Sequence, residues 1–158
     1  MGSARISKKI AIYGAGGFGR EVKMLIDQIN ESGRGNYDFL GFFDESPNAG
    51  ENYGYSILGG IQSLIDMPEP IFVAVAIGNP SIKEKVVADL RSSRAQIETL
   101  IHPSVYLGIP EAEIGAGSIL CAGCVVTVNV RIGKALILNL CSTVGHETVI
   151  GDFCSVMP

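Results

Sequence analysis

The chain has little of several features that common classes of protein need. Its 158 residues include no tryptophan and only two histidines, and 12 Lys and Arg stand against 16 Asp and Glu. A net charge of −4 without a basic cluster excludes binding to a nucleic-acid backbone, because no patch of lysine or arginine would neutralise the phosphates. No apolar run of roughly 18 residues occurs, which excludes a membrane-spanning helix.

The four cysteines do not suggest a metal site or a disulfide framework. Cys121 and Cys124 have C-x-x-C spacing, but the sequence holds no second pair of this kind. We therefore expect no bound metal. Because the amino terminus also lacks an apolar signal core, cysteines of this kind predict a reducing, cytoplasmic compartment.

Glycine is abundant, at 20 residues, nearly twice the usual share of about 7%. In residues 1–103, short apolar runs alternate with stretches of helical periodicity. This alternation predicts an α/β domain with a small, Rossmann-like parallel sheet. The expected strands are 9–13, 37–43, 71–77 and 97–101, and the first two expected helices are 20–30 and 61–66. A third helix is expected to start at the capping box Ser81–Glu84, with an apolar face made of Ile82, Val86, Val87 and Leu90.

A glycine-rich loop follows the first expected strand and matches the pattern G-x-G-x-x-G. Glycines between a strand and a helix let the backbone approach a pyrophosphate at the helix N-terminus, although they also suit a tight turn without a ligand. Asp44 ends the next strand, where a dinucleotide fold places the acid that binds a ribose. Asn79 follows the third strand and either lines the same crevice or caps a loop. The candidate substrate-binding residues are Gly14, Gly16, Gly17, Phe18, Gly19, Asp44 and Asn79.

Residues 104–158 carry a branched aliphatic residue at every sixth position. Neither a helix nor an alternating strand has this period, whereas a parallel β-helix does, because each six-residue unit supplies one short strand and one corner. We expect the aliphatic side chain to point inward, beside a small residue four positions later, and about 18 residues to complete a coil. The aliphatic positions are Ile114, Leu120, Val126, Ile132, Leu138, Val144, Ile150 and Val156.

Together these features resemble the bacterial sugar acyltransferases with hexapeptide repeats, which include sialic acid O-acetyltransferases and UDP-4-amino-sugar N-acetyltransferases. The resemblance rests on residues 12–22, 41–44, 75–79, 101–104 and 145–153. It implies a left-handed β-helix, an exception to the usual right-handed crossover. It also implies a homotrimer with acetyl-CoA bound between neighbouring helices.

Three departures from the family pattern bear on the site. One is that Ser155 stands where the family has a histidine near acetyl-CoA. Family members usually have histidine where this chain has Phe18. They also continue for several more coils beyond the position of Pro158. We therefore expect a truncated chain, with most of the acetyl-CoA-binding residues beyond Pro158.

His146 and Glu147 are the candidate catalytic residues, at a corner just after the inward Val144. Acyl transfer to an amine or hydroxyl needs a base, and an imidazole oriented by a carboxylate suits this task near neutral pH. A lone histidine on a turn usually has no chemical role, but the resemblance implies that this His–Glu pair is catalytic. His102, at the junction of the two parts, is expected to be a packed or hydrogen-bonded linker residue.

The resulting prediction divides the chain into a nucleotide-sugar-binding domain, residues 1–103, and an incomplete acyltransferase domain, residues 104–158. We expect an acetyl-CoA-dependent acetyltransferase with His146 as the general base. Its acceptor would be a UDP-sugar, another nucleotide-linked amino sugar or a sialic-acid-type glycan precursor. One alternative is a non-catalytic trimer that binds a nucleotide sugar. The other, suggested by the glycine motif alone, is an NAD-dependent oxidoreductase.

Overall fold

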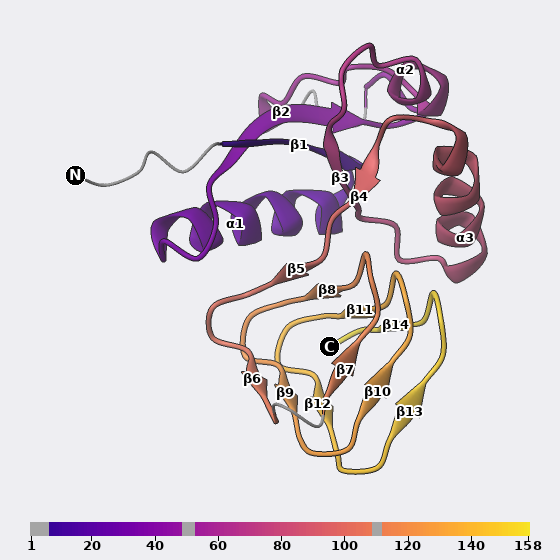
Figure 1. Cartoon of the computed structure of the whole chain (residues 1–158). Helices are drawn as coiled ribbons and strands as arrows, with labels where there is room; N and C mark the ends of the chain where they lie inside the picture. Colours follow the sequence, from indigo (N-terminus) through magenta and orange to yellow (C-terminus); the bar gives the residue numbers. More distant parts are fainter. Residues whose placement is uncertain (1–6, 49–52, 109–111) are drawn as a thin grey trace.

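The computed structural model describes residues 7–48, 53–108 and 112–158, which form an α/β unit seated on a triangular β-helix (Figure 1). The α/β unit contains a parallel sheet with the strand order β2-β1-β3-β4. Its elements are β1 (Lys8–Tyr13), α1 (Gly17–Glu31), β2 (Tyr37–Phe43), α2 (Ile61–Ile65), β3 (Phe72–Val75), α3 (Pro80–Asp89), the short 3₁₀ helix η2 (Leu90–Ser92) and β4 (Gln96–Ile97).

The central strand β1 is buried on both faces, because helices cover the sheet from two sides (Figure 1). Ile10 and Ile12 belong to an apolar cluster with residues of α1. Ala11 and Tyr13 belong to a second cluster with residues of α2 and α3. The alternation follows from the two-residue period of a strand. The predicted α/β domain with a parallel sheet is confirmed.

One expected strand, 97–101, is in fact two strands that lie in different sheets. Gln96–Ile97 (β4) pairs with β3, whereas Leu100–Ile101 (β5) pairs with β8 (Ile119–Leu120) of the β-helix. An apolar run shows that a segment is buried but does not show which sheet it joins, so the prediction of one strand is wrong. Pairing of the β-helix therefore begins at Leu100. The division of the chain into 1–103 and 104–158 stays a prediction.

Helix α3 also differs from its prediction, because Asn79 rather than Ser81 caps it. The Asn79 side chain accepts a hydrogen bond from the Ile82 N–H at 3.1 Å. Pro80 occupies the first turn, which suits a residue without an N–H. Ile82, expected on the apolar face, is 53% exposed, and Lys83 is buried instead.

The β-helix consists of two-residue strands arranged in three parallel sheets, ordered β14-β11-β8-β5, β12-β9-β6 and β13-β10-β7. Partners lie one coil apart, so that Leu120 pairs with Leu138 and Val126 with Val144. The predicted six-residue period is confirmed, since each predicted aliphatic residue is the second residue of a strand. The remaining strands are β6 (Tyr106–Leu107), β7 (Glu113–Ile114), β9 (Val125–Val126), β10 (Arg131–Ile132), β11 (Ile137–Leu138), β12 (Thr143–Val144), β13 (Val149–Ile150) and β14 (Ser155–Val156).

The corners of the β-helix repeat as well. The third residue after each inward aliphatic residue, from Ile114 to Ile150, has a positive φ. Two of these corner residues are glycines, whereas the other five are not and have φ between 50° and 61°. Residues other than glycine adopt this left-handed conformation only at some free-energy cost. The left-handed corner residues are Gly117, Gly123, Asn129, Ala135, Cys141, Glu147 and Phe153.

The two units share an apolar core. Ile119 and Ile137 are the first residues of their strands and so point out of the β-helix, yet both are buried beneath α1. They belong to the same cluster as Val22 and Ile26 of α1, and Phe18 packs against it. The sheet β14-β11-β8-β5 is therefore the face of the β-helix on which the α/β unit rests.

Candidate functional site

The glycine loop joins β1 to α1, and its glycines have different surroundings. Gly14 has a φ of 106°, and a Cβ atom there would lie 2.8 Å from the carbonyl oxygen of Ala76. A Cβ atom on Gly19, inside α1, would collide with the carbonyl of Gly14. Gly16, the N-cap residue of α1, has open space where a Cβ would lie. The loop thus packs tightly against the sheet at two positions and is open at the helix N-terminus, where a phosphate would bind.

Gly17 and Phe18 lie in the first turn of α1, which starts at Gly17 rather than at residue 20 as predicted. Gly17 is exposed, and the only group within 4 Å of a Cβ there would be the Arg20 guanidinium. Phe18 instead packs against the core between α1 and the β-helix. Gly17 thus lies on the exposed side of the loop, whereas the Phe18 side chain packs into the apolar core and fixes the first turn of α1 there.

Asp44 lies directly beside the glycine loop, as expected for two adjacent strand ends. One of its carboxylate oxygens accepts a hydrogen bond from the Ala15 N–H at 2.9 Å, and the other accepts from the Ser46 N–H at 2.9 Å. The structure therefore brings Asp44 and the loop together and gives the carboxylate a role in shaping it. Asn79 was expected either to line the crevice or to cap a loop. The structure shows that it caps α3, because its Oδ1 accepts a hydrogen bond from the Ile82 N–H in the first turn of that helix.

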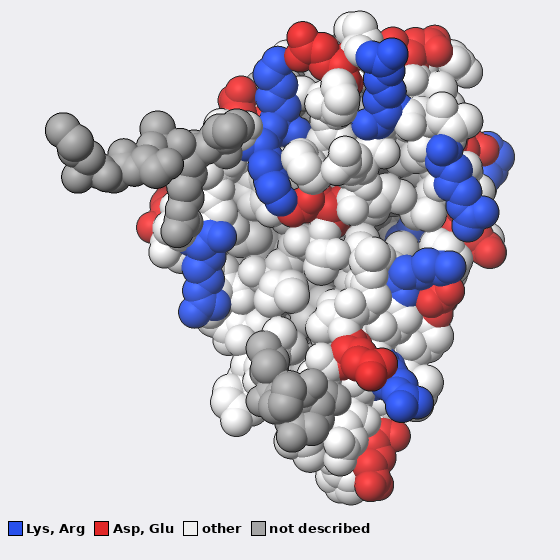
Figure 2. Space-filling view, in the orientation of Figure 1, with Lys and Arg blue, Asp and Glu red and all other residues white. Residues whose placement is uncertain are grey.

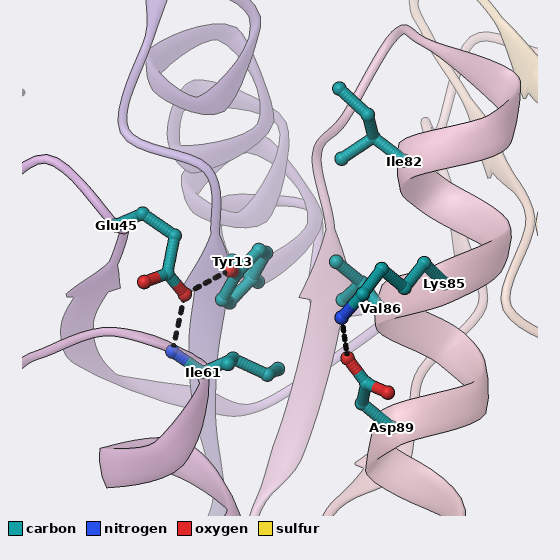
Figure 3. A pocket seen from close by; sticks show the side chains of 7 residues that line it. All are labelled: Tyr13, Glu45, Ile61, Ile82, Lys85, Val86 and Asp89. Carbon is teal, nitrogen blue, oxygen red and sulfur yellow. Dashed lines mark hydrogen bonds and ion pairs between the residues drawn. The ribbon is translucent and has the colours of Figure 1, made fainter.

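A pocket of about 310 Å³ opens next to this loop, on the side of the sheet covered by α2 and α3 (Figure 3). The Tyr13 hydroxyl donates to Glu45 at 2.9 Å, and Glu45 also accepts from the Ile61 N–H at 2.8 Å. These two donors lower the pKa of Glu45, whereas burial and the neighbouring carboxylate raise the pKa of Tyr13. Lys85 and Asp89 of α3 form an ion pair on the opposite wall. No motif in the sequence indicates this pocket, although Tyr13 and Glu45 directly flank the predicted site residues Gly14 and Asp44.

His146 and Glu147 lie in the turn between β12 and β13. Both side chains are exposed, at 77% and 76%, and His146 Nδ1 lies 3.6 Å from Glu147 Oε2. Glu147 occupies one of the left-handed corners, and its N–H donates to the Val128 carbonyl at 3.2 Å. The corner therefore holds the backbone of Glu147 while its carboxylate stays near the imidazole. A carboxylate in this position can orient an imidazole that acts as a base.

The structure does not bring His146 together with the glycine loop within one chain. The turn that carries His146 joins the sheets β12-β9-β6 and β13-β10-β7. The α/β unit rests on the remaining sheet, β14-β11-β8-β5. Figure 1 shows the β12–β13 turn at the far end of the molecule from the end of β1. The two parts of the predicted site are therefore separated within one chain.

The second histidine, His102, lies at the junction of the two units, as expected. Its Nε2 is 3.1 Å from Gln28 Oε1, and its Nδ1 is 2.7 Å from Ser104 Oγ. Burial and the nearby Arg34 guanidinium lower the pKa of His102. These contacts are those of a hydrogen-bonded linker residue.

The charges and cysteines add little to the site. Positive and negative side chains are interspersed over the face shown in Figure 2, without a patch of one sign. All four cysteines are free. In the described ranges 7–48, 53–108 and 112–158, no group of three or more His, Cys, Asp or Glu is placed to hold a metal ion. The helices of the same ranges are all too short or too polar to cross a bilayer.

A Rossmann-like unit with a glycine loop, seated on a β-helix of six-residue repeats, defines a class of two-unit hexapeptide-repeat proteins. Within that class, residues 9–90, just over half of the chain, match the family described as the PglD N-terminal domain. The chain therefore belongs to the PglD-like family of sugar acetyltransferases, and the predicted family resemblance is confirmed.

Known proteins resemble the chain across both units. A GDP-perosamine N-acetyltransferase from Escherichia coli O157:H7 is 26% identical over 147 residues, which are 93% of this chain and 66% of the relative. The acetyltransferase domain of PglB from Neisseria gonorrhoeae FA1090, solved in complex with acetyl coenzyme A, is 27% identical. Its TM-score is 0.81, and the match covers 95% of this chain and 70% of that one. WeeI from Acinetobacter baumannii AYE is 32% identical with a TM-score of 0.78, covering 94% and 69%.

These matches settle the fold class. The α/β domain followed by a left-handed parallel β-helix, as predicted, is confirmed. The chain spans about two thirds of the length of the curated relative.

Proposed function

We propose that this chain provides the acceptor-binding unit and the catalytic corner of an acetyl-CoA-dependent N-acetyltransferase. The observation that carries the proposal is that both of its units, and not the glycine loop alone, align with a relative named for N-acetylation of a nucleotide-linked amino sugar. An exposed His–Glu pair on the β-helix supplies a group able to accept a proton. The PglB domain, which resembles this chain, was solved with acetyl coenzyme A, and this supports acetyl-CoA as the donor.

The proposed acceptor is an amino sugar linked to a nucleoside diphosphate. Its pyrophosphate would lie at the open N-terminus of α1, over Gly16 and Gly17, with Asp44 at the adjacent strand end. The family resemblance of the sequence favours a UDP-sugar, whereas the curated relative is named for a GDP-linked sugar. The diphosphate is common to both, and it is the part that the glycine loop is suited to bind.

In the proposed reaction the amine of the sugar attacks the thioester carbonyl of acetyl-CoA. The C–N bond forms as the C–S bond breaks, and His146 removes the proton from the attacking nitrogen and passes it to the departing CoA sulfur. Glu147 holds the imidazole in position and stabilises its protonated form. No metal is required in this scheme, because the base and the leaving group exchange one proton.

The separation of the two half-sites is the reason to propose that each site is shared between neighbouring chains, and the family resemblance is the reason to propose a homotrimer. If the acceptor is held by the glycine loop of one chain, His146 must come from a neighbouring chain. A cyclic assembly pairs each glycine loop with the His146 corner of the next copy, so all sites are complete.

Replacement of the proposed base tests this function. His146→Ala should lower the turnover number by about 10²–10⁴-fold, because a general base contributes a factor of this size. The KM for the nucleotide amino sugar should change little, since His146 is remote from the glycine loop. Release of CoA from acetyl-CoA measures the rate.

The matched control is His102→Gln, which changes the other histidine, a linker residue bonded to Gln28. It should keep a rate near that of the wild type. Wild-type turnover in His146→Ala would remove His146 from the mechanism.

A further inference from the structure

Lys83 is the only buried residue with a formal charge among the residues that the structure describes. It lies on α3, and its side chain is directed at the last strand of the β-helix. Its ammonium group donates to the carbonyl oxygen of Cys154 at 3.1 Å and to Ser155 Oγ at 2.8 Å. A single side chain thus joins the α/β unit to residues 150–158. These residues are called the third coil, because two coils of 18 residues, 114–131 and 132–149, precede them from Ile114 onwards.

A second contact joins the same two parts of the molecule. Gly78, between β3 and α3, is so close to Met157 that a Cβ atom on the glycine would lie 3.0 Å from the methionine Cε. Met157 in turn accepts a weak hydrogen bond from the buried Asn139 side chain, with 3.6 Å between Nδ2 and Sδ. The segment that runs from β3 into α3 therefore rests on the third coil at two points.

This segment also contacts the glycine loop. Ala76 donates its N–H to the Tyr13 carbonyl at 2.8 Å, and its own carbonyl lies against Gly14. Any shift of the segment relative to the β-helix would therefore shift the place where the acceptor is held.

We propose that Lys83 is a positioning residue for acetyl transfer, which holds the acceptor crevice in one fixed position relative to the β-helix. The proposal rests on the proposed function. The ammonium group finds its two oxygen acceptors at one place on the third coil. A seating of α3 away from this place would leave the buried ammonium group without them. Acetyl transfer between two separate half-sites depends on such seating, because a displacement of about 1 Å far from the chemistry can cost a hundredfold in rate.

Stability does not explain a buried lysine at this position. Burial lowers the pKa of Lys83 from 10.5 to about 8, which means that the folded protein disfavours the charge it carries at neutral pH. Replacement of a buried charge by an apolar side chain of similar size is often neutral or stabilising. Lys83→Met should therefore leave the thermal unfolding midpoint unchanged or raise it. If Lys83 had only a structural role, the substitution would lower the midpoint.

Hydrogen exchange tests whether Lys83 holds the third coil. The Ile137 and Asn139 amides donate to Cys154 and Val156 of that coil. In Lys83→Met their exchange should be faster by about tenfold, because the coil loses its tie to α3. Lys9→Met is the matched control, since Lys9 is an exposed lysine of β1 paired with Glu69. Equal exchange rates in the two variants would overturn the proposal.

Kinetics of the same variants test the positioning role. In Lys83→Met the kcat for acetyl transfer should fall by about tenfold, whereas the KM for the nucleotide amino sugar should stay within about twofold. An unchanged kcat would show that Lys83 does not position the acceptor. If the wild-type product of the complete reading frame transfers no acetyl group, the proposed function fails, and the exchange measurement still decides whether Lys83 holds the third coil.

Discussion

At the scale of single residues, the glycine loop contains glycines that the fold needs and a glycine that it does not. Gly19 lies against the Gly14 carbonyl with no room for a Cβ atom, whereas Gly16 faces open space. Gly19→Ala should therefore lower the free energy of unfolding by about 2–3 kcal/mol through overpacking. Gly16→Ala should change it by less than about 1 kcal/mol, because its φ of −67° suits alanine.

Urea unfolding of the two variants measures this difference. A similar effect of both substitutions would show that the loop does not pack as described. The motif alone predicts three glycines, but only the contacts separate packing from ligand access.

Lys83 illustrates what residue-level sequence reasoning misses. By periodicity, Ile82 belongs on the buried face of the third helix and Lys83 on the exposed face. The structure reverses these roles, because α3 packs on the sheet and also meets the third coil, which supplies two oxygen acceptors for the ammonium. Periodicity describes one buried face, and it cannot anticipate a second contact surface from a distant part of the chain.

At the scale of elements, the β-helix is the part most completely predicted. Its aliphatic period specifies both the strands and the register, because each coil repeats the same inward positions. The corners were predicted, but their left-handed conformation was not. Five of the seven left-handed corner residues are not glycine, so no glycine pattern indicates them.

The corner at Asn129 permits a test of this geometry. Asn129 is exposed and has a φ of 57°, which asparagine tolerates better than other non-glycine residues do. Asn129→Val should lower the free energy of unfolding by about 1–2 kcal/mol, because a β-branched residue is strained in this conformation. Asn129→Gly, the control, should be neutral or slightly stabilising. Equal stability of the two variants in thermal unfolding would argue against a left-handed corner.

At the scale of the whole molecule, the glycine loop lies where the α/β unit meets the β-helix, whereas the β12–β13 turn, which carries His146, lies at the far end of the β-helix (Figure 1). The proposed shared site predicts that two inactive variants complement each other. Gly16→Asp should prevent binding of the diphosphate by charge repulsion, and it should still fold because aspartate is a good helix N-cap. His146→Ala removes the base. Mixed trimers should recover about a quarter of the wild-type rate, because random assortment completes one site in four.

Co-expression of the two variants, followed by a CoA-release assay, measures this recovery. Each variant expressed alone serves as the control. If activity does not return in the mixed population, loop and base belong to the same chain and the shared-site arrangement fails.

The sequence by itself determined the two kinds of architecture, because strands, helices and β-helix coils repeat their apolar side chains with periods of two, 3.6 and six residues. The family followed from a resemblance of whole motifs, such as residues 12–22 and 145–153. The glycine loop, Asp44 and the His–Glu pair were likewise visible as motifs. Only the tertiary structure decided that β4 and β5 part into different sheets, that Lys83 ties α3 to the third coil, and that the two half-sites lie apart. The physical reason is that these features depend on contacts between segments far apart in the chain, for which a local pattern carries no signal.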